Sequence, residues 1–581
     1  MSFKLRLVAL LLVVMMLLTS CALPLDQILG YLPEGWIPTT TEQTTTTEPT
    51  TTPTTTPSTT VKTEPEEPKW SKAEHSTSKE ELLARYTLTR EEVDATLALL
   101  DSMVVGADGS MTIEEVDALY DEFEEDFYHV AQQMTIASII YYHNMKDEEA
   151  STRHLDTQKM FNEIRDKYME SCRTMYLESP YSEELFADWS EEDIKELLDF
   201  DPETTRVKEE VEELQVKYNE LGEYNWSEKS AEIYAQIVTK NNELAKLYGY
   251  ENYYDYASVN VYGRDYSKED LAVFRQNVIK HIVPRFTKLN NGWQALYDFS
   301  DTRRKLTISY LTEGFDTMDK NYLLLYLDSL GDTGMGVAMR DVFESKNCAF
   351  STNGNSHPTA FQTYLYEDET PFCFFGSNGQ SSSTMVHEFG HYYASYANND
   401  LSNYDLCETH SQGNEFLFLQ FCKDELPSKV YSAVRYYNLF NAYYVILMAT
   451  IIDDFEQRVY ALESVEGFTG EDFDAIMTEV IADYGKSADW FETNLANVYD
   501  YWRNVAIDNP VYYISYAVSA VAAVEIFAIA EEDYDAAMAA YTTLVEGVTA
   551  EDGFLEALKK AGLTTPFETE TFEKVAATMR K

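Results

Sequence analysis

The chain has 581 residues, and its formal net charge at pH 7 is −56. So acidic a protein should repel nucleic acid and anionic lipid headgroups, which excludes both as electrostatic partners. The charge indicates either a solubilising surface or, in a cleft, a preference for cationic peptides. The chain is too long for one compact core, so more than one lobe is expected.

Residues 1–20 have the pattern of a lipoprotein signal peptide. An unbroken apolar run at 7–18 follows a basic start, and the run is too short to span a bilayer comfortably. It leads into Leu-Thr-Ser-Cys, which resembles a bacterial lipoprotein cleavage box and makes Cys21 the predicted lipid acceptor. An ordinary signal peptide cut nearby is the alternative. Because diacylglycerol supplies two chains, we expect an extracytoplasmic protein held on the cell membrane through this anchor alone.

Residues 21–70 are predicted to form a stalk that begins at the lipidated cysteine. Between Pro38 and Pro68 the chain is mostly Thr, Pro and Glu, with almost no apolar residues. Such a composition cannot build a core and favours an extended, disordered segment. In polyproline-like form it could hold the rest of the protein up to roughly 95 Å from the membrane.

Beyond the stalk the sequence is helical in pattern, and the predicted fold class is all-α, mainly helical. Two helix starts are marked by Thr89-x-x-Glu92 and Ser267-x-x-Asp270. Two lobes are expected: a helical N-terminal lobe at 71–345 and a second lobe at 346–581, which contains the only closely spaced pair of histidines near an acidic residue, His387 and His391 with Glu388.

Strand signals are concentrated just before residue 380. Residues 359–366 alternate in part, and 371–375 follow after an acidic turn. They predict a small β-sheet beside the next helix, whose edge could pair with an extended peptide. The cysteines other than Cys21 have irregular spacing, which argues against a disulfide framework. A bridge between Cys348 and Cys373 is possible, but the sequence does not establish it.

The sequence His387-Glu388-Phe389-Gly390-His391 predicts a metal site on a helix. Residues i and i+4 lie on one helical face, so both imidazoles can reach one zinc ion while Glu388 lies beside it as a proton acceptor. The alternative is a core helix with two hydrogen-bonded histidines. Catalytic zinc usually has three protein ligands plus water, so a third ligand is needed.

A second predicted helix offers that ligand. Glu408 could reach the metal, and Glu415 lies two turns on, where it could orient a ligand histidine. Spacing alone does not exclude His410 as the third ligand. Glu415 could also belong to a solvated acidic face, and His410 could be an ordinary polar residue.

These residues carry a family resemblance. The HExxH turn followed by E-x-x-S-Q-x-x-E resembles the zinc peptidases of the thimet oligopeptidase and oligoendopeptidase F family. Residues 242–253 resemble the family's upstream helical segment, and 510–517 resemble its tyrosine-rich helix. The resemblance spans roughly residues 200 to 560, and the segments occur in family order.

The resemblance implies two helical lobes around a deep substrate channel and a zinc-dependent endopeptidase that hydrolyses oligopeptides. One Zn²⁺ per chain would be held by His387, His391 and Glu408, with Glu388 as the general base. Chemistry of this kind also needs a hydrogen-bond donor for the developing oxyanion. The candidate donors, which could equally be core aromatics, are Tyr512, Tyr513 and Tyr516.

One departure from the family favours a different function. No histidine follows His410, so the donor histidine that family members usually carry before the tyrosine segment is missing. The alternative is a surface peptide-binding lipoprotein of the same fold with weakened catalysis. Another zinc hydrolase, such as an exopeptidase, is a third possibility. We expect a monomer whose partners are short peptide substrates.

Overall fold

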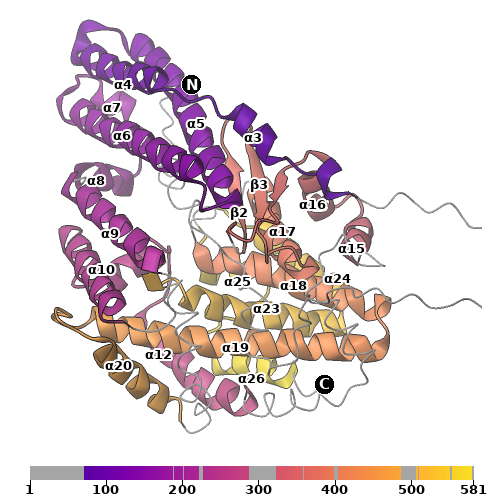
Figure 1. Cartoon of the computed structure of the whole chain (residues 1–581). Helices are drawn as coiled ribbons and strands as arrows, with labels where there is room; N and C mark the ends of the chain where they lie inside the picture. The colour runs from indigo at the N-terminus through magenta and orange to yellow at the C-terminus, as the bar shows by residue number, and fades with distance from the viewer. Residues whose placement is uncertain are drawn as a thin grey trace, which may run out of the picture.

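The structure is a computed structural model. It describes residues 71–187, 189–199, 202–221, 227–286, 322–357, 359–397, 403–485, 506–507, 509–549 and 552–578. The predicted signal peptide, Cys21 and the stalk lie outside the described residues. The described chain is mainly helical with one small β-sheet, which confirms the predicted fold class (Figure 1).

The N-terminal helices pack around a core of their own. Long helices form here because capping boxes start them, as at Thr89 and Glu92, and apolar residues recur on one face. The core joins Val93, Phe123 and Phe161 from three helices. The helices and short turns of this part are η2 Lys72–Glu74, α3 Lys79–Arg85, α4 Arg90–Val105, η3 Gly106–Ser110, α5 Ile113–His143, α6 Glu148–Glu178, α7 Ser182–Leu185 and α8 Glu191–Asp199.

The next helices share a core with the C-terminal half of the chain. The buried apolar residues of the helices from Val207 onward join one large core, whereas Leu197 belongs to the N-terminal one. The predicted lobe boundary between residues 345 and 346 stays a prediction, but the packing itself changes near residue 200. The elements are α9 Pro202–Leu221, α10 Glu228–Leu247, α11 Tyr253–Asn260, α12 Lys268–Asn277, η4 Val278–Ile282, α15 Tyr322–Leu330 and α16 Gly334–Glu344.

The sheet has three strands in the order β1-β3-β2. The strands are β1 Cys348–Phe350, β2 Ala360–Leu365 and β3 Thr370–Phe375. The two predicted strands are β2 and β3, which form an antiparallel pair. The missed strand β1 is only three residues long and runs parallel to β3. Its pairing places Cys348 opposite Cys373, and both are buried free thiols.

Alternate side chains of β3 face opposite sides of the sheet. Phe372 and Phe374 belong to an apolar cluster with α5, whereas Phe375 contacts Phe389 of α17. The N-terminal segment covers the outer edge of β1, because the Thr77 N–H donates to the Cys348 carbonyl at 2.8 Å. Nearby, the Lys72 ammonium donates to Gln380 Oε1 at 2.7 Å. The sheet is thus enclosed on both faces and at one edge.

The remaining helices form the C-terminal half. They are α17 Ser382–Tyr396, α18 Tyr404–Glu425, α19 Ser428–Tyr460, α20 Gly470–Asp483, α23 Ile514–Glu532, α24 Tyr534–Glu546, α25 Phe554–Lys560 and α26 Thr569–Thr578. Figure 1 shows α18, α23 and α19 stacked below the sheet. Among the described residues, α23 alone is long and apolar enough to cross a membrane, but 83% of its apolar stretch is buried. It is the central core helix.

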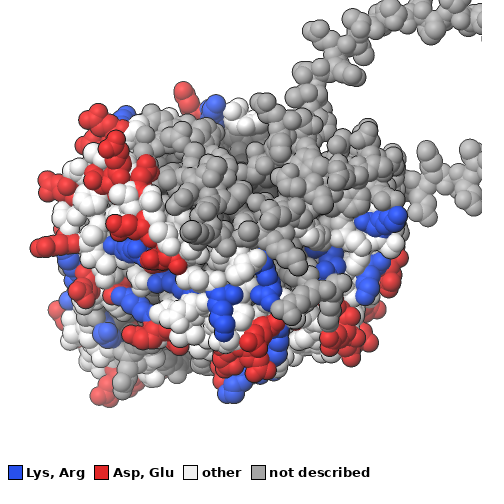
Figure 2. All heavy atoms as spheres, turned by 90° about the horizontal axis from the view of Figure 1, so that it is seen from below, with Lys and Arg blue, Asp and Glu red and all other residues white. Residues whose placement is uncertain are grey.

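Charged side chains of both signs lie on the surface. On the face shown in Figure 2, lysines and arginines lie among the acidic residues. Several form exposed pairs within one helix, such as Arg90 with Asp94. Pairs of this kind contribute little to stability, about 0.3–0.5 kcal/mol each. On this face the intermixing agrees better with a solubilising surface than with one uninterrupted acidic patch.

Candidate metal centre

The helix α17 presents both histidines and Glu388 to the interior. It starts where the Ser381 side chain accepts a hydrogen bond from the Thr384 N–H at 3.1 Å, which satisfies one of the unpaired amides of the first turn. His387 and His391 follow one turn apart, with ring centroids 5.2 Å apart. Both rings are buried. Glu388, which lies between the two histidines in the sequence, is fully buried. The predicted helix is therefore confirmed, and its polar residues are not on a solvated face.

The helix α18 lies directly against α17 and supplies Glu408. Close contact is possible because residue 390 is glycine: a Cβ there would lie 2.5 Å from the carbonyl oxygen of His410. Further along, the Asn414 amide donates to the carbonyl of Val386 at 2.7 Å. These contacts bring the fully buried Glu408 carboxylate to the two histidines.

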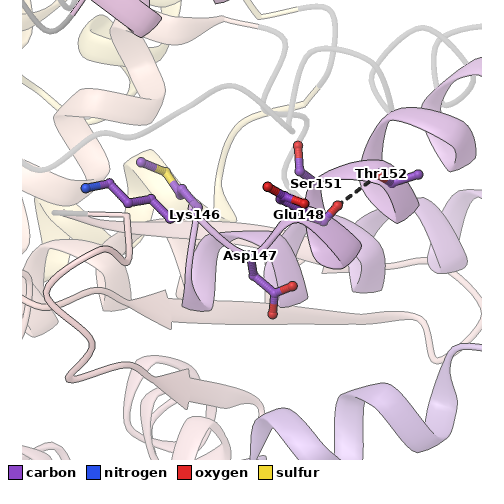
Figure 3. Close-up of a pocket in the computed structure, with 6 residues that line it drawn as sticks. Lys146, Asp147, Glu148, Ser151 and Thr152 are labelled. Atoms are coloured by element: carbon purple, nitrogen blue, oxygen red, sulfur yellow. Dashed lines mark hydrogen bonds between the residues drawn. The ribbon is translucent and has the colours of Figure 1, made fainter.

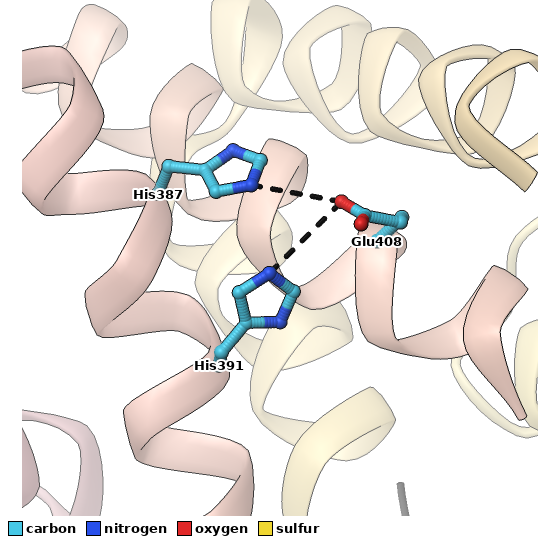
Figure 4. A group of neighbouring side chains, drawn as sticks. All are labelled: His387, His391 and Glu408. Carbon is cyan, nitrogen blue, oxygen red and sulfur yellow. Dashed lines mark ion pairs between the residues drawn. The ribbon is translucent and has the colours of Figure 1, made fainter. Parts of the chain in front are cut away.

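Three side-chain atoms converge at this point (Figure 4). One ligand atom from each of His387, His391 and Glu408 lies within 4.8 Å of the others. Glu408 Oε2 is 3.6 Å from His387 Nε2 and 4.0 Å from His391 Nε2. Ligands about 2.0–2.2 Å from one tetrahedral metal lie roughly 3.3–3.6 Å apart, so Glu408 Oε2 is already close to this spacing from His387 Nε2. Because both Nε2 atoms are buried without a hydrogen-bond partner in the described structure, the residues fit a metal ion.

Neighbouring side chains orient these atoms. His387 Nδ1–H donates to Glu415 Oε1 at 2.7 Å, which leaves the Nε2 lone pair for a metal. On Glu408, Oε2 accepts from the Ser411 hydroxyl at 2.9 Å, and Oε1 accepts from the Tyr512 hydroxyl. The placement of Glu415 agrees with the predicted orienting role rather than with a solvated acidic face.

Glu388 differs from its neighbours Glu408 and Glu415, whose carboxylates accept hydrogen bonds. Burial raises its pKa to about 8; His387 lowers the pKa, and Glu408 and Glu415 raise it. Neither of its oxygens has a hydrogen-bond partner among the described residues. A bound dication would favour the ionised form. The result is an unpaired carboxylate, able to exchange a proton near neutral pH, beside the metal ligands.

Comparison with solved structures places this geometry in a known fold. No protein-family model matches the sequence, and no curated protein matches it either. PZ peptidase A solved with an inhibitor is similar in structure, with a TM-score of 0.68 and 18% identity over 86% of this chain and 99% of that one. A Bacillus anthracis protein assigned as an oligoendopeptidase F has a TM-score of 0.65 and 17% identity, over 85% of this chain and 96% of that one. The chain has the oligoendopeptidase F fold. The predicted resemblance is thereby confirmed at the level of the fold.

In this oligoendopeptidase F fold, His410 is turned away from the metal ligands. Its Nε2–H donates to the carbonyl of Leu544 at 3.1 Å, and burial lowers its pKa to about 4. A neutral, fully buried imidazole that is bonded to α24 has a structural role. Of the two candidates for the third ligand, the structure therefore brings Glu408 to the histidines, and not His410.

The three tyrosines lie where the chain enters α23. Tyr512 and Tyr513 precede the first helical residue, Ile514, so Tyr512 is not on the helix that was expected to carry it. The Tyr516 ring contacts those of Tyr512 and Tyr513, with centroids 5.1 and 5.4 Å away. All three are buried. The Tyr512 hydroxyl donates to Glu408, one of the three candidate metal ligands, and the catalytic role of the three tyrosines stays a prediction.

Sequence reasoning missed the residues that hold Tyr512 in place. Tyr262 and Arg264 precede α12, and Glu456 lies on α19; all three bond the backbone at 510–512. The available signal was the acidic Asp453, Asp454 and Glu456 in an otherwise apolar helix, where buried charges need partners.

A separate depression lies at the start of α6 (Figure 3). It is lined by Met145, Lys146, Asp147, Glu148, Ser151 and Thr152. The hydrogen bond drawn there joins the Thr152 hydroxyl to the Glu148 carbonyl within one helical turn. It contains none of the metal-binding histidines, so the candidate site remains the cluster on α17 and α18.

Proposed function

We propose that the protein is a zinc-dependent endopeptidase that hydrolyses oligopeptides outside the cytoplasm. The observation that carries this proposal is the convergence of His387, His391 and Glu408 beside the unpaired Glu388 carboxylate. Two histidines and one carboxylate form the ligand set of several zinc peptidases, in which a fourth position is left for water. The fold of the solved peptidases supports the same reading.

The chain's own residues supply the proton transfers. When bound, zinc would polarise the scissile carbonyl and make water more acidic. The Glu388 carboxylate accepts a proton from the attacking water as its oxygen bonds to the carbonyl carbon. Glu388 then delivers that proton to the amine nitrogen as the C–N bond breaks. Burial of Glu388 favours this cycle, because it brings the protonated and ionised forms closer in energy at neutral pH.

Tyrosine hydroxyls are the candidates for stabilising the oxyanion. The sequence has no histidine after His410, and Tyr512 already donates to Glu408. We therefore keep Tyr512, Tyr513 and Tyr516 as the candidate donors. Removal of the donor by a Phe substitution should lower kcat by roughly 100- to 1000-fold with little change in KM. A structural tyrosine would instead lower folding stability and leave the rate per folded molecule unchanged.

The experiment combines metal analysis with one conservative variant. Elemental analysis of purified protein should find one zinc per chain, removable by chelator. Glu388→Gln should retain that zinc and bind peptides, yet lose turnover of a mixed peptide library by at least about 100-fold. Absence of a stoichiometric metal, or equal cleavage by both proteins, would sink the proposal.

The missing histidine favours one alternative function, a peptide-binding surface lipoprotein with weakened catalysis. The zinc-loaded wild type would then bind peptides without cutting them.

Product sizes test the exopeptidase alternative: internal fragments indicate an endopeptidase, and single terminal residues indicate an exopeptidase. A carboxypeptidase from Pyrococcus furiosus shares the fold more distantly, with a TM-score of 0.50 and 13% identity.

The location of the reaction rests on the N-terminal sequence. We propose that Cys21 carries the lipid and that residues 22–70 separate the catalytic body from the membrane. Cys21→Ser should move the protein from the membrane fraction to the soluble fraction. Unchanged membrane association would contradict the anchor.

A further inference from the structure

The turn that leads into α23 has a backbone conformation that its sequence disfavours. Val511 has φ of +70°, in the left-handed region that β-branched residues rarely adopt. Its side chain is fully buried. A strained residue of this kind persists only when its surroundings hold it in place.

Three side chains from distant parts of the chain hold this turn by its backbone. The Tyr262 hydroxyl donates to the Pro510 carbonyl at 2.7 Å. Arg264 Nη2 donates to the Val511 carbonyl at 2.7 Å and to the Tyr512 carbonyl at 3.4 Å. On the opposite side, the Val511 N–H donates to Glu456 Oε1 at 2.8 Å. The peptide groups on both sides of Val511 are therefore fixed.

This turn determines where Tyr512 points. The Tyr512 ring packs against those of Tyr262 and Tyr404, each with its centroid 5.5 Å away, and these two rings also contact each other. At the end of the ring, the hydroxyl donates to Oε1 of Glu408, while Glu408 Oε2 faces the histidines. Rotation of the Val511 backbone toward an ordinary conformation would move the ring away from Glu408.

Arg264 makes more hydrogen bonds to this turn than Tyr262 or Glu456 does. It is 5% exposed, and it also donates to the Ser515 hydroxyl in the first turn of α23 at 3.2 Å. Its charge faces the buried carboxylate of Asp405, one helical turn before Glu408 on α18. Arg264 is thus placed between the helix that carries the third ligand and the turn that carries Tyr512.

We propose that Arg264 is a positioning residue for the metal centre: it holds the Val511 turn so that the Tyr512 hydroxyl orients Glu408. The proposal rests on the proposed function, because Glu408 must be a metal ligand for its orientation to matter. Outer partners of metal ligands typically change metal affinity or activity by about 10- to 100-fold when removed.

The test measures zinc affinity by chelator competition in the full-length protein. Arg264→Gln and Tyr512→Phe should each weaken zinc binding by about 10- to 100-fold. The double variant should be no weaker than either single variant, because both remove the same contact. The matched control is Arg435→Gln, which removes another largely buried arginine that donates to a backbone carbonyl, that of Thr578, at 2.7 Å. It should lower folding stability and leave the zinc affinity of the folded protein unchanged.

Two further variants keep the test decisive if Arg264→Gln folds poorly. Tyr262→Phe removes one hydrogen bond from the same turn and should weaken zinc binding in the same direction. Val511→Gly in the Arg264→Gln background should recover part of the affinity, because glycine adopts positive φ without being held there.

Two outcomes would overturn the proposal. The first is that Arg264→Gln and Tyr262→Phe both bind zinc as tightly as the wild type does. If only one of these variants folds, wild-type affinity in that variant is enough. The second is that Arg264→Gln weakens zinc binding by the same factor in the wild type and in the Tyr512→Phe background. In either case zinc binding and peptide cleavage by the wild type would leave the proposed function intact. A folded wild type without zinc would overturn both.

Discussion

Glu415 determines which nitrogen of His387 can bind a metal. Its carboxylate accepts the Nδ1 proton at 2.7 Å, so the neutral ring carries its lone pair on Nε2, which faces Glu408. Burial lowers the pKa of His387, but the carboxylates around it raise that pKa to about 9 in the metal-free protein. A metal must therefore displace a proton from Nε2, and zinc binding should weaken as pH falls.

Removal of this carboxylate should weaken zinc binding without removing a ligand. Glu415→Ala is expected to lower zinc affinity by about 10- to 100-fold, because His387 loses the partner that fixes its ring and tautomer. Glu415→Gln keeps an acceptor oxygen and should have a smaller effect. Chelator competition on both variants checks the order. Equal affinity in all three proteins would show that Glu415 does not orient the ligand.

At the residue scale, the sequence predicted what local spacing determines. His387 and His391 share a face because they are four residues apart, and the following helix places Glu408 and Glu415 on the same side. The support of Tyr512 could not be predicted in this way. Arg264 is 247 positions from the carbonyl that it binds, and no periodicity relates residues so far apart in the chain.

The contact between α17 and α18 depends on one glycine. The two helices carry all three ligand residues, and Gly390 lies where their backbones approach. A Cβ at this position would lie 2.7 Å from the Cα of Ser411, and that backbone atom cannot move without its helix. The two helices can approach closely because residue 390 has no side chain, and this approach sets the distance between the histidines and Glu408.

Gly390→Ala should therefore destabilise the protein and disturb the metal site together. Overpacking typically lowers the free energy of unfolding by about 1–3 kcal/mol, and separation of the helices should weaken zinc binding. The control is Gly413→Ala on α18, where the nearest atoms at 3.1 Å belong to the Tyr541 ring. Urea denaturation and chelator competition should show the larger loss for Gly390→Ala; similar losses would argue against a backbone contact.

At the element scale, caps and alternation predicted helices and two strands, but the short strand β1 was not predicted. The starts at Thr89 and Ser267 are capping boxes in the structure, and 371–375 lies within β3. The three residues of β1 are too few to show alternation, and their pairing with β3 is parallel and non-local.

His143 joins the N-terminal helices to the sheet that precedes α17. It ends α5, its ring packs edge-on against Phe374 of β3, and its carbonyl accepts from the Ser351 hydroxyl at 3.0 Å. Burial, with a smaller effect of Lys79, lowers its pKa to about 4. In the unfolded chain a histidine has a pKa of about 6.5, so the unfolded state binds more protons between these two values.

The whole molecule should therefore lose stability in mild acid through this residue. The contribution of neutral His143 to the free energy of unfolding is complete above pH 6.5 and is lost as pH falls toward 4. At pH 5 the loss is about 2 kcal/mol. His143→Phe keeps the ring packing and cannot protonate. Urea denaturation at pH 7.5 and pH 5 should show a smaller loss for the variant than for the wild type. The same loss in both would mean that His143 is not responsible.

At the scale of the whole molecule, the sequence predicted the helical class and the fold, but not how the cores are divided. The helices from Val207 onward pack into the same core as the C-terminal half, although they resemble their N-terminal neighbours in pattern. Amphipathic periodicity shows that a helix has a buried face; it does not show which partner covers that face.

The N-terminal segment that lies along β1 has a consequence for how the protein can be truncated. An exposed strand edge is a template for pairing with another chain, and Thr77 occupies that edge here. Cleavage within the threonine-rich stalk would release a body with this edge still covered. Removal of the chain through residue 78 would uncover it, and such a fragment should self-associate through the sheet while keeping an intact metal centre.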